Sequence, residues 1–133
     1  MKTLPAEASD QEILDTVREW VEFLAEERYD EAYHFFVNTE HNPRNWSPQL
    51  LKTVIQTYGF HDKREFHRVT PVEKTTGGVK PRHDIHRDDD NDQQGFIWFD
   101  LPLDGKWSDL TAVLTFHANN KRLSIELESI EVM

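Results

Sequence analysis

Residues 123–132 read LSIELESIEV, and this stretch decides the fold class of the chain. In its first part, apolar and polar residues alternate, which is the pattern of a strand with one buried face. The apolar positions of this part are Leu123, Ile125 and Leu127. The next two apolar residues, Ile130 and Val132, have the opposite parity. Because a slip of one residue moves every side chain to the other face of a sheet, we expect a β-bulge near Ser129, and a bulge bends the sheet.

Two more predicted strands precede this stretch. Residues 95–101 predict a strand with apolar side chains on both faces, and residues 108–117 alternate cleanly. Asp104-Gly105 between them is a strong signal for a two-residue hairpin turn, and Asn119-Asn120 predicts the turn that follows. The fully apolar parity is expected to face the protein interior. Its members are Ile97, Phe99, Leu101, Leu110, Ala112, Leu114 and Phe116.

The region before these strands is less regular. Residues 65–74 predict a strand interrupted at Pro71, because proline cannot donate a hydrogen bond to a β-ladder. Residues 75–94 are rich in Gly, Asp and Asn, and they predict a loop.

The N-terminal part predicts helices between residues 9 and 59. Ser9 and Glu12 form a capping box at the start of the first helix, which has one apolar stripe. A second, shorter helix is expected to begin near Asp30. Ser47-Pro48 supplies an N-cap and a first-turn proline for a third helix, and Gly59 suits its C-terminal end. Helices followed by strands predict an α+β fold, with N-terminal helices packed in the concave face of a curved antiparallel sheet.

Length and charge restrict the possible functions. The 133 residues are expected to form a single domain, residues 1–133, with a hydrophobic core. The chain has 15 Lys and Arg against 25 Asp and Glu, a net charge of −10. Nucleic acids and anionic membranes attract basic proteins, so we expect neither as a partner. The acidic balance fits a basic protein partner, or it serves solubility.

The absence of certain residues and motifs restricts the chemistry further. The chain contains no cysteine, which excludes disulfides, thiolate catalysis and cysteine-ligated zinc. We find neither the apolar core of a signal peptide nor an apolar run that could span a membrane, and a cytoplasmic location is expected. Glycine-rich phosphate loops, nucleophile elbows and zinc-protease motifs are also absent, and we expect no cofactor.

The order of the elements resembles that of a known superfamily. An amphipathic first helix, a second helix that opens with Arg28-Tyr29-Asp30-Glu31-Ala32-Tyr33, a third helix and a long antiparallel meander resemble the nuclear-transport-factor-2-like (cystatin-like cone) superfamily. The resemblance covers roughly residues 10–132 and implies an α+β cone. The superfamily includes isomerases, dehydratases, ligand binders and inert interaction modules, among them small bacterial immunity proteins. Function therefore has to be argued from the site.

The most polar segment is HDIHRDDDND, residues 83–92. His and Asp side chains ligate divalent metals, so His83 and His86 are candidate metal ligands. A calcium-binding loop within this segment would need glycine where the chain has Gln93 and glutamate where it has Phe99. We expect a solvated hairpin loop instead, because runs of like charge are usually surface. Its aspartates are candidate contacts to a basic partner: Asp88, Asp89, Asp90 and Asp92.

Three residues are candidates for acid–base catalysis: Asp100, His117 and His34. The resemblance implies that an enzyme of this superfamily uses a carboxylate or histidine inside the cone as general base. Asp100 and His117 have the parity opposite to the apolar one, which predicts ordinary positions on the outer sheet surface. His34 can line the mouth of the cone, but a histidine on a mixed helix face is more often structural. Candidates for lining a pocket in the cone are Trp20, Tyr33 and Tyr58.

Phe96, Trp98 and Val113 share the outer parity of the predicted sheet. Exposed aromatic residues on a sheet face predict an interaction surface, unless a loop or the N-terminal segment covers them. The resemblance implies a homodimer through this face.

These patterns together predict a non-catalytic module that binds a protein or a small ligand. A specific form of this hypothesis is an immunity-type protein whose carboxylates bind a basic toxin. The first alternative is a cofactor-free isomerase or dehydratase acting on a small hydrophobic substrate in the cone. The second is metal binding by residues 83–92.

Overall fold

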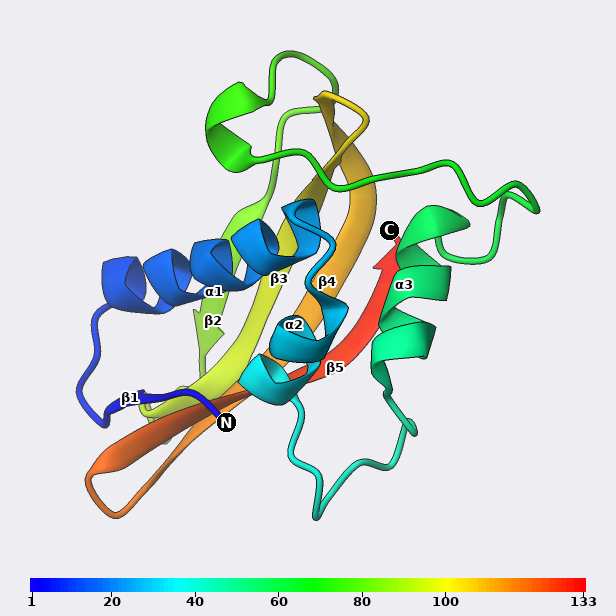
Figure 1. Ribbon diagram of the computed structural model, residues 1–133. Helices are drawn as coiled ribbons and strands as arrows, with labels where there is room; N and C mark the ends of the chain where they lie inside the picture. Colours follow the sequence, from blue (N-terminus) through cyan, green and yellow to red (C-terminus); the bar gives the residue numbers. More distant parts are fainter.

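The computed structural model describes all 133 residues, and it shows a layer of helices packed against one curved antiparallel sheet (Figure 1). The helices are α1 (Asp10–Ala25), α2 (Tyr29–Phe36) and α3 (Pro48–Gln56). The strands are β1 (Thr3–Pro5), β2 (His83–Arg87), β3 (Gln94–Leu103), β4 (Lys106–Asn119) and β5 (Arg122–Val132). Their order in the sheet is β1-β5-β4-β3-β2. The predicted α+β architecture is therefore confirmed.

Local capping signals determine where the helices begin. Ser9 Oγ accepts a hydrogen bond from the Glu12 N–H at 3.2 Å, and Glu12 Oε1 accepts one from the Ser9 N–H at 3.2 Å. This is the predicted capping box. Ser47 Oγ caps α3 by accepting from the Leu50 N–H at 3.0 Å. Each cap contributes about 1 kcal/mol to stability. None of the three helices combines the length and apolar character that crossing a bilayer requires.

The apolar parity of the strands faces the helices, as predicted. The strand residues without exposed surface include Ile97, Phe99, Leu101, Leu110, Ala112 and Leu114. Trp20 of α1 is fully buried against this face, with its ring 5.5 Å from that of Phe36. Its indole N–H donates to Ala32 O at 3.2 Å, so the one polar atom of this large side chain is satisfied.

The curvature of the sheet has a defined cause in β5. Val113 of β4 pairs with Ser129, but the next residue, Leu114, pairs with Leu127. Glu128 is therefore the extra residue of a β-bulge, which confirms the bulge predicted near Ser129. Beyond the bulge Ile130 is only 6% exposed, so the strand keeps its apolar side chains on the helical side after the slip.

Two predictions for the middle of the chain are wrong. Residues 65–74 form no strand: Val69 makes an isolated bridge to Leu103, and Val72–Lys74 is a short 3-10 turn. Residues 75–94 are not all loop, because β2 lies within them and pairs with β3. β2 is an edge strand with a single aliphatic side chain, Ile85, so its sequence lacks the apolar alternation that marks a strand.

Candidate functional site

The sheet face turned away from the helices holds a group of side chains that we call the aromatic strip: His86, Phe96, Trp98 and Val113. His86 of β2 stacks on Phe96 of β3, with ring centroids 4.6 Å apart and ring planes at 18°. The Phe96 and Trp98 rings are 5.8 Å apart, and Val113 of β4 lies directly across from Trp98. The predicted interface residues therefore adjoin one another. Phe96, Trp98 and Val113 are each half-buried and keep part of their surface in solvent.

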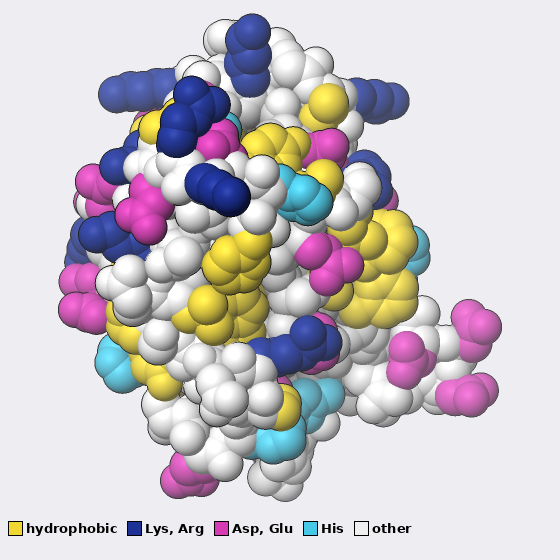
Figure 2. Space-filling view, turned by 90° about the vertical axis from the view of Figure 1, so that its right-hand side faces the viewer, with side chains coloured by type: hydrophobic (Ala, Val, Ile, Leu, Met, Phe, Trp, Pro, Cys, Tyr) yellow, Lys and Arg dark blue, Asp and Glu magenta, His cyan; other side chains and the backbone are white.

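The strip lies on an accessible side of the molecule. Figure 2 shows hydrophobic side chains, with histidine beside them, at the right-hand edge of the view, which is the side behind the sheet in Figure 1. The helices cover only the opposite face, and β1 pairs along the edge of β5. The N-terminal strand thus extends the sheet sideways instead of lying over the strip.

An ion pair between a buried aspartate and a partly exposed arginine borders the strip. Asp100 is 1% exposed and accepts hydrogen bonds from Arg82 Nε at 3.1 Å, Arg82 Nη2 at 3.1 Å and Thr111 Oγ1 at 2.6 Å. The Arg82 guanidinium lies 5.9 Å from the Trp98 ring centroid. Its hydrogen bonds to Asp100 raise the pKa of Arg82, which keeps the guanidinium charged. Asp100 therefore positions a cation beside Trp98.

The prediction for Asp100 was right about the face and wrong about exposure. The side chain points outward from the sheet, as its parity required, but Arg82 covers it. With its carboxylate oxygens bonded to Arg82 and Thr111, Asp100 has the surroundings of a structural group and not of a general base. His117, the other outward candidate, is exposed on β4.

The other end of the strip carries the acidic loop, residues 88–93, which joins β2 to β3. Its carboxylates at Asp88, Asp89, Asp90 and Asp92 are all exposed. The base of the loop is fixed, because Arg87 donates to Asp10 Oδ1 at 2.9 Å and to the carbonyl oxygen of Asp92. The solvated hairpin loop predicted for residues 83–92 is right for residues 88–92 and wrong for residues 83–87, which form β2. The loop leaves four carboxylates in solvent next to the stacked His86 and Phe96 rings.

The two candidate metal ligands lie on opposite faces of β2. His86 belongs to the strip, whereas His83 stacks on the inward-facing Phe99, with ring centroids 3.9 Å apart and planes at 8°. Burial lowers the pKa of His83, and Arg18 adds to the effect. Because alternate residues of a strand point to opposite sides, these two imidazoles cannot ligate one ion. No group of three or more His, Asp or Glu side chains is arranged to hold a metal ion.

The residues predicted to line a pocket in the cone do not meet. Trp20 is part of the core, and neither Trp20 nor Tyr33 lines any cavity. Tyr33 packs edge-on against the exposed His34 on α2. Tyr58 follows α3, donates a hydrogen bond to Asp109, and lines an open cavity of about 510 Å³ beside the β3–β4 turn.

A polar cluster beside Tyr58 was not predicted from the sequence. His67 Nδ1 lies 2.6 Å from Asp104 Oδ2, and His67 Nε2 lies 3.4 Å from Asp62 Oδ2. A carboxylate oxygen thus faces each nitrogen of the His67 ring. The backbone N–H of Arg64 is the main cause that lowers the pKa of Asp62. The cluster fastens the segment after α3 to the β3–β4 turn, and Asp104 is too distant in sequence for any local pattern to reveal it.

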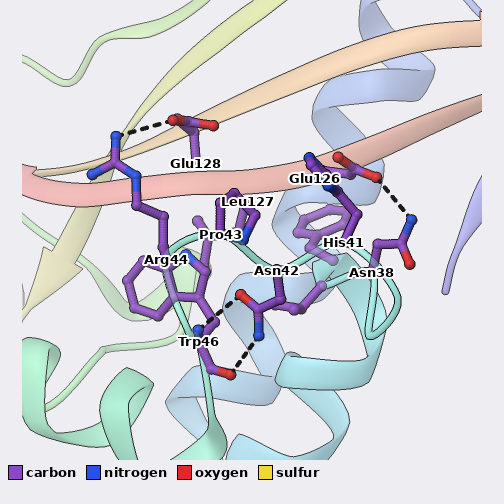
Figure 3. A pocket seen from close by; sticks show the side chains of 11 residues that line it. Asn38, His41, Asn42, Pro43, Arg44, Trp46, Glu126, Leu127 and Glu128 are labelled. Atoms are coloured by element: carbon purple, nitrogen blue, oxygen red, sulfur yellow. Dashed lines mark hydrogen bonds and ion pairs between the residues drawn. The ribbon is translucent and has the colours of Figure 1, made fainter.

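A small cavity lies between β5 and the segment that joins α2 to α3 (Figure 3). Asn42 brackets the backbone of Trp46, accepting from its N–H at 2.8 Å and donating to its carbonyl at 2.8 Å. Arg44 pairs with Glu128 at 3.0 Å across the same cavity. Its volume of about 40 Å³ has room for a water molecule but not for an organic ligand.

Comparisons with known proteins give no match: no family model, no curated protein and no solved structure matches the chain. The aromatic strip and the acidic loop therefore have to be interpreted from their own chemistry.

Proposed function

We propose that this protein is a non-catalytic module that binds a basic protein partner through the outer face of its sheet. The observation that carries the proposal is the position of the acidic loop next to the aromatic strip, within the single β2–β3 hairpin. One structural unit thus offers an apolar surface and four exposed carboxylates together.

This arrangement has the anatomy of a protein interface. Aromatic side chains are enriched at the centres of interfaces, and charged groups belong at the rim. Trp98 is the largest side chain of the strip, and Asp84 lies directly across from it on β2. A Lys or Arg of the partner would meet both a carboxylate and an aromatic face there, and cation–π contacts add to the ion pair. We therefore assign Trp98 as the anchor and the carboxylates as the charged rim.

The charge favours a basic partner over a second copy on this face. A twofold axis through the strip would bring the carboxylates around it against those of the partner copy, and like charges at an interface are repulsive. A basic protein experiences the opposite effect, because the net charge of −10 attracts it and raises the association rate.

The architecture fits a narrower form of the proposal. A cone-like α+β fold, an acidic and cysteine-free composition and an outer binding face agree with a nuclear-transport-factor-2-like protein of the immunity type, directed at a basic toxin. The isomerase or dehydratase alternative needs space for a substrate near Trp20, where packed side chains lie instead.

Affinity capture with matched variants tests the proposal. One variant changes Asp88, Asp89, Asp90 and Asp92 to Asn, and a second carries Trp98→Ala. The control changes four exposed carboxylates elsewhere, Glu19, Glu40, Glu65 and Glu73, to Gln, which gives the same net charge of −6 from the −10 of the parent.

We expect the parent chain to capture a basic protein whose affinity falls at least about 30-fold with Trp98→Ala, as for an interface anchor. The loop variant should slow association and reduce its salt dependence more than the charge-matched control does. Equal binding by all four chains, or capture of acidic proteins alone, would refute the proposal.

A further inference from the structure

The strand β2 forms one edge of the sheet, and no other strand lies beside its outer side (Figure 1). At the end of this strand, the Asp88 N–H donates to Gln94 O at 3.0 Å. Bonded and non-bonded pairs alternate in an antiparallel ladder, so the even-numbered residues of β2 share hydrogen bonds with β3. The odd-numbered residues therefore direct their N–H and C=O groups to the free edge. These residues are His83, Ile85 and Arg87.

The backbone groups on this free edge are available for pairing. The main chain of β2 is hydrogen-bonded to β3 alone, and no turn or loop bonds to the three odd-numbered residues. Two features that commonly block a sheet edge are also missing. β2 contains no proline, and its register with β3 runs through residues 83–87 without a bulge. Such an edge is a template for one more strand.

Both ends of β2 are fixed within the molecule. At its start, Asp100 Oδ2 accepts a hydrogen bond from the Arg82 N–H at 2.8 Å. At its end, Arg87 donates to Asp10 Oδ1 at 2.9 Å and to Ala8 O at 3.1 Å. A docking segment that is already held in its bound conformation loses less entropy when a partner binds. The free edge of β2 is therefore preorganised.

The charges around the edge decide which strand can pair with it. Residues 83–92 contain five aspartates and one arginine, and this Arg87 is already paired with Asp10. A second copy that paired through the same edge would bring the aspartates of the two copies together, and like charges across a strand pair are destabilising. A Lys or Arg across from Asp84 forms a favourable cross-strand pair instead. The edge thus favours a basic strand over a second copy.

The two faces of β2 also determine the sequence pattern that fits the edge. Asp84 and His86 are exposed on the outer face, beside the acidic loop and within reach of the aromatic strip. Ile85 points to the helical side, where it is half-buried against the core. Because side chains alternate along a strand, basic residues at every second position with apolar residues between them match both faces.

We infer that the basic partner binds by adding an extended segment to the free edge of β2, as a further strand of the sheet. The inference rests on the proposed function and names how the partner is held. The β2 backbone supplies the hydrogen bonds, and Asp84 with the acidic loop selects basic side chains. A strand at this edge lies next to His86, so the contact continues onto the aromatic strip.

Amide hydrogen exchange followed by nuclear magnetic resonance tests the strand addition. The probe is a short peptide of alternating lysine and valine with blocked ends. In the free chain the amides of His83, Ile85 and Arg87 should exchange rapidly, because they have no acceptor. Saturating peptide should slow their exchange at least about 10-fold. The same peptide with every backbone nitrogen methylated keeps its charge but cannot donate, and its methyl groups prevent close approach of the strands, so it should give no protection.

Two proline variants locate the contact. Ile85→Pro removes an N–H that faces the free edge and keeps the bonds to β3, so it should raise the dissociation constant of the peptide at least about 10-fold. The matched control is Thr3→Pro on β1, at the opposite edge of the sheet. Since the Ala6 N–H donates to Lys121 O, the Thr3 N–H also faces away from the sheet, and its loss should leave peptide binding unchanged. Near-ultraviolet circular dichroism verifies that both variants are folded.

The outcomes separate this inference from the proposed function. Peptide binding that shifts the Trp98 indole resonance but leaves the β2 amides unprotected, or that survives Ile85→Pro, would overturn the inference and leave the basic partner on the aromatic strip. No binding at about 1 mM peptide, a weak-binding limit, would also overturn it. An acidic peptide of alternating glutamate and valine that protects the edge equally well would contradict the proposed preference for a basic partner, and the inference with it.

Discussion

At the scale of single residues, Asp100 is the group on which the outer sheet face depends. Replacing it by Asn removes the charge that Arg82 pairs with and weakens its hydrogen bonds. We expect Asp100→Asn to lower the free energy of unfolding by about 2 kcal/mol. The loss stays below that of a fully buried pair, because the Arg82 side chain is 35% exposed and water can solvate it.

Urea unfolding measures this change, with Asp84→Asn as the control. Asp84 lies on the same face but is exposed, so its substitution should change stability by no more than about 0.5 kcal/mol. Similar losses in the free energy of unfolding for the two variants would show that the hydrogen bonds of Asp100 to Arg82 and Thr111 do not stabilise this face more than an exposed aspartate does.

His83 should make stability depend on pH. Burial is the main cause that lowers its pKa below the ordinary 6.5. The unfolded chain therefore binds more protons than the folded chain between the lowered pKa and 6.5, and stability rises with pH there. The stability that the neutral His83 ring contributes is fully present above pH 6.5 and is lost as the pH falls below this value. His83→Phe keeps a ring that can stack on Phe99 but cannot be protonated.

We expect the parent chain to lose stability relative to His83→Phe as the pH falls from about 7.5 to about 5.5, the range in which histidine ordinarily titrates. Urea unfolding at several pH values measures the difference. Parallel stability curves for the two chains would mean that burial does not perturb this ring.

Single residues also show where prediction from sequence stops. The outward direction of Asp100 follows from strand parity, which is a local property. Its burial does not, because the covering side chain, Arg82, is 18 residues away. The pairing of His67 with Asp104 is likewise a contact between distant segments. Local periodicity determines where a side chain points, and only the tertiary structure determines what covers it.

At the scale of elements, the β2–β3 hairpin is the unit that brings charge and aromatic surface together. Gly95 permits this pairing, because a Cβ at that position would lie 2.0 Å from His86 O and 3.0 Å from the Phe116 ring. The clash with backbone cannot be relieved by a side-chain rotation. We expect Gly95→Ala to separate β2 from β3 locally and to lower the free energy of unfolding by about 2 kcal/mol or more.

Hydrogen exchange resolves this effect by position. Faster exchange should be confined to the amides of β2 and its β3 partners in the Gly95→Ala variant. Gly77→Asn is the matched control, since nothing lies within 4 Å of a Cβ there and asparagine tolerates its φ of +70°. An unchanged β2 in Gly95→Ala would show that the hairpin does not need this glycine.

The elements that could be predicted are those with strong local signals. The capping box at Ser9, the Asp104-Gly105 turn and the bulge near Ser129 each depend on neighbouring residues. β2 was missed because His, Asp and Arg surround its single Ile, and it is a strand only because β3 pairs with it. Residues 65–74 have strand-like composition, but only Val69 reaches a partner strand. The aromatic strip was partly foreseen, since parity placed Phe96 and Trp98 on one sheet face. The position of His86 in the strip could not be predicted, because it depends on β2, which the sequence did not reveal.

At the scale of the whole molecule, charge is unevenly distributed. Residues 63–82 contain six Lys and Arg and only two acidic residues, against the net charge of −10 for the chain. Figure 2 shows Lys and Arg side chains concentrated in the upper part of the molecule. The acidic loop lies at the opposite end of β2 from this segment. Such a charge distribution would orient the proposed basic partner toward the acidic loop and the aromatic strip beside it.

The uneven charge also predicts a cost in stability. Four exposed carboxylates in the acidic loop repel one another, and fixed structure keeps them close, whereas unfolding lets them separate. Changing Asp88, Asp89, Asp90 and Asp92 to Asn should therefore raise the free energy of unfolding, by up to about 1 kcal/mol at low salt. Salt screens the repulsion, so the gain should shrink as ionic strength increases. Thermal and urea unfolding at low and high salt measure it. A loss of stability in this variant would mean that the aspartates help to form the hairpin. A gain would mean that the loop keeps its charge at the expense of stability, which is expected of a surface retained for binding.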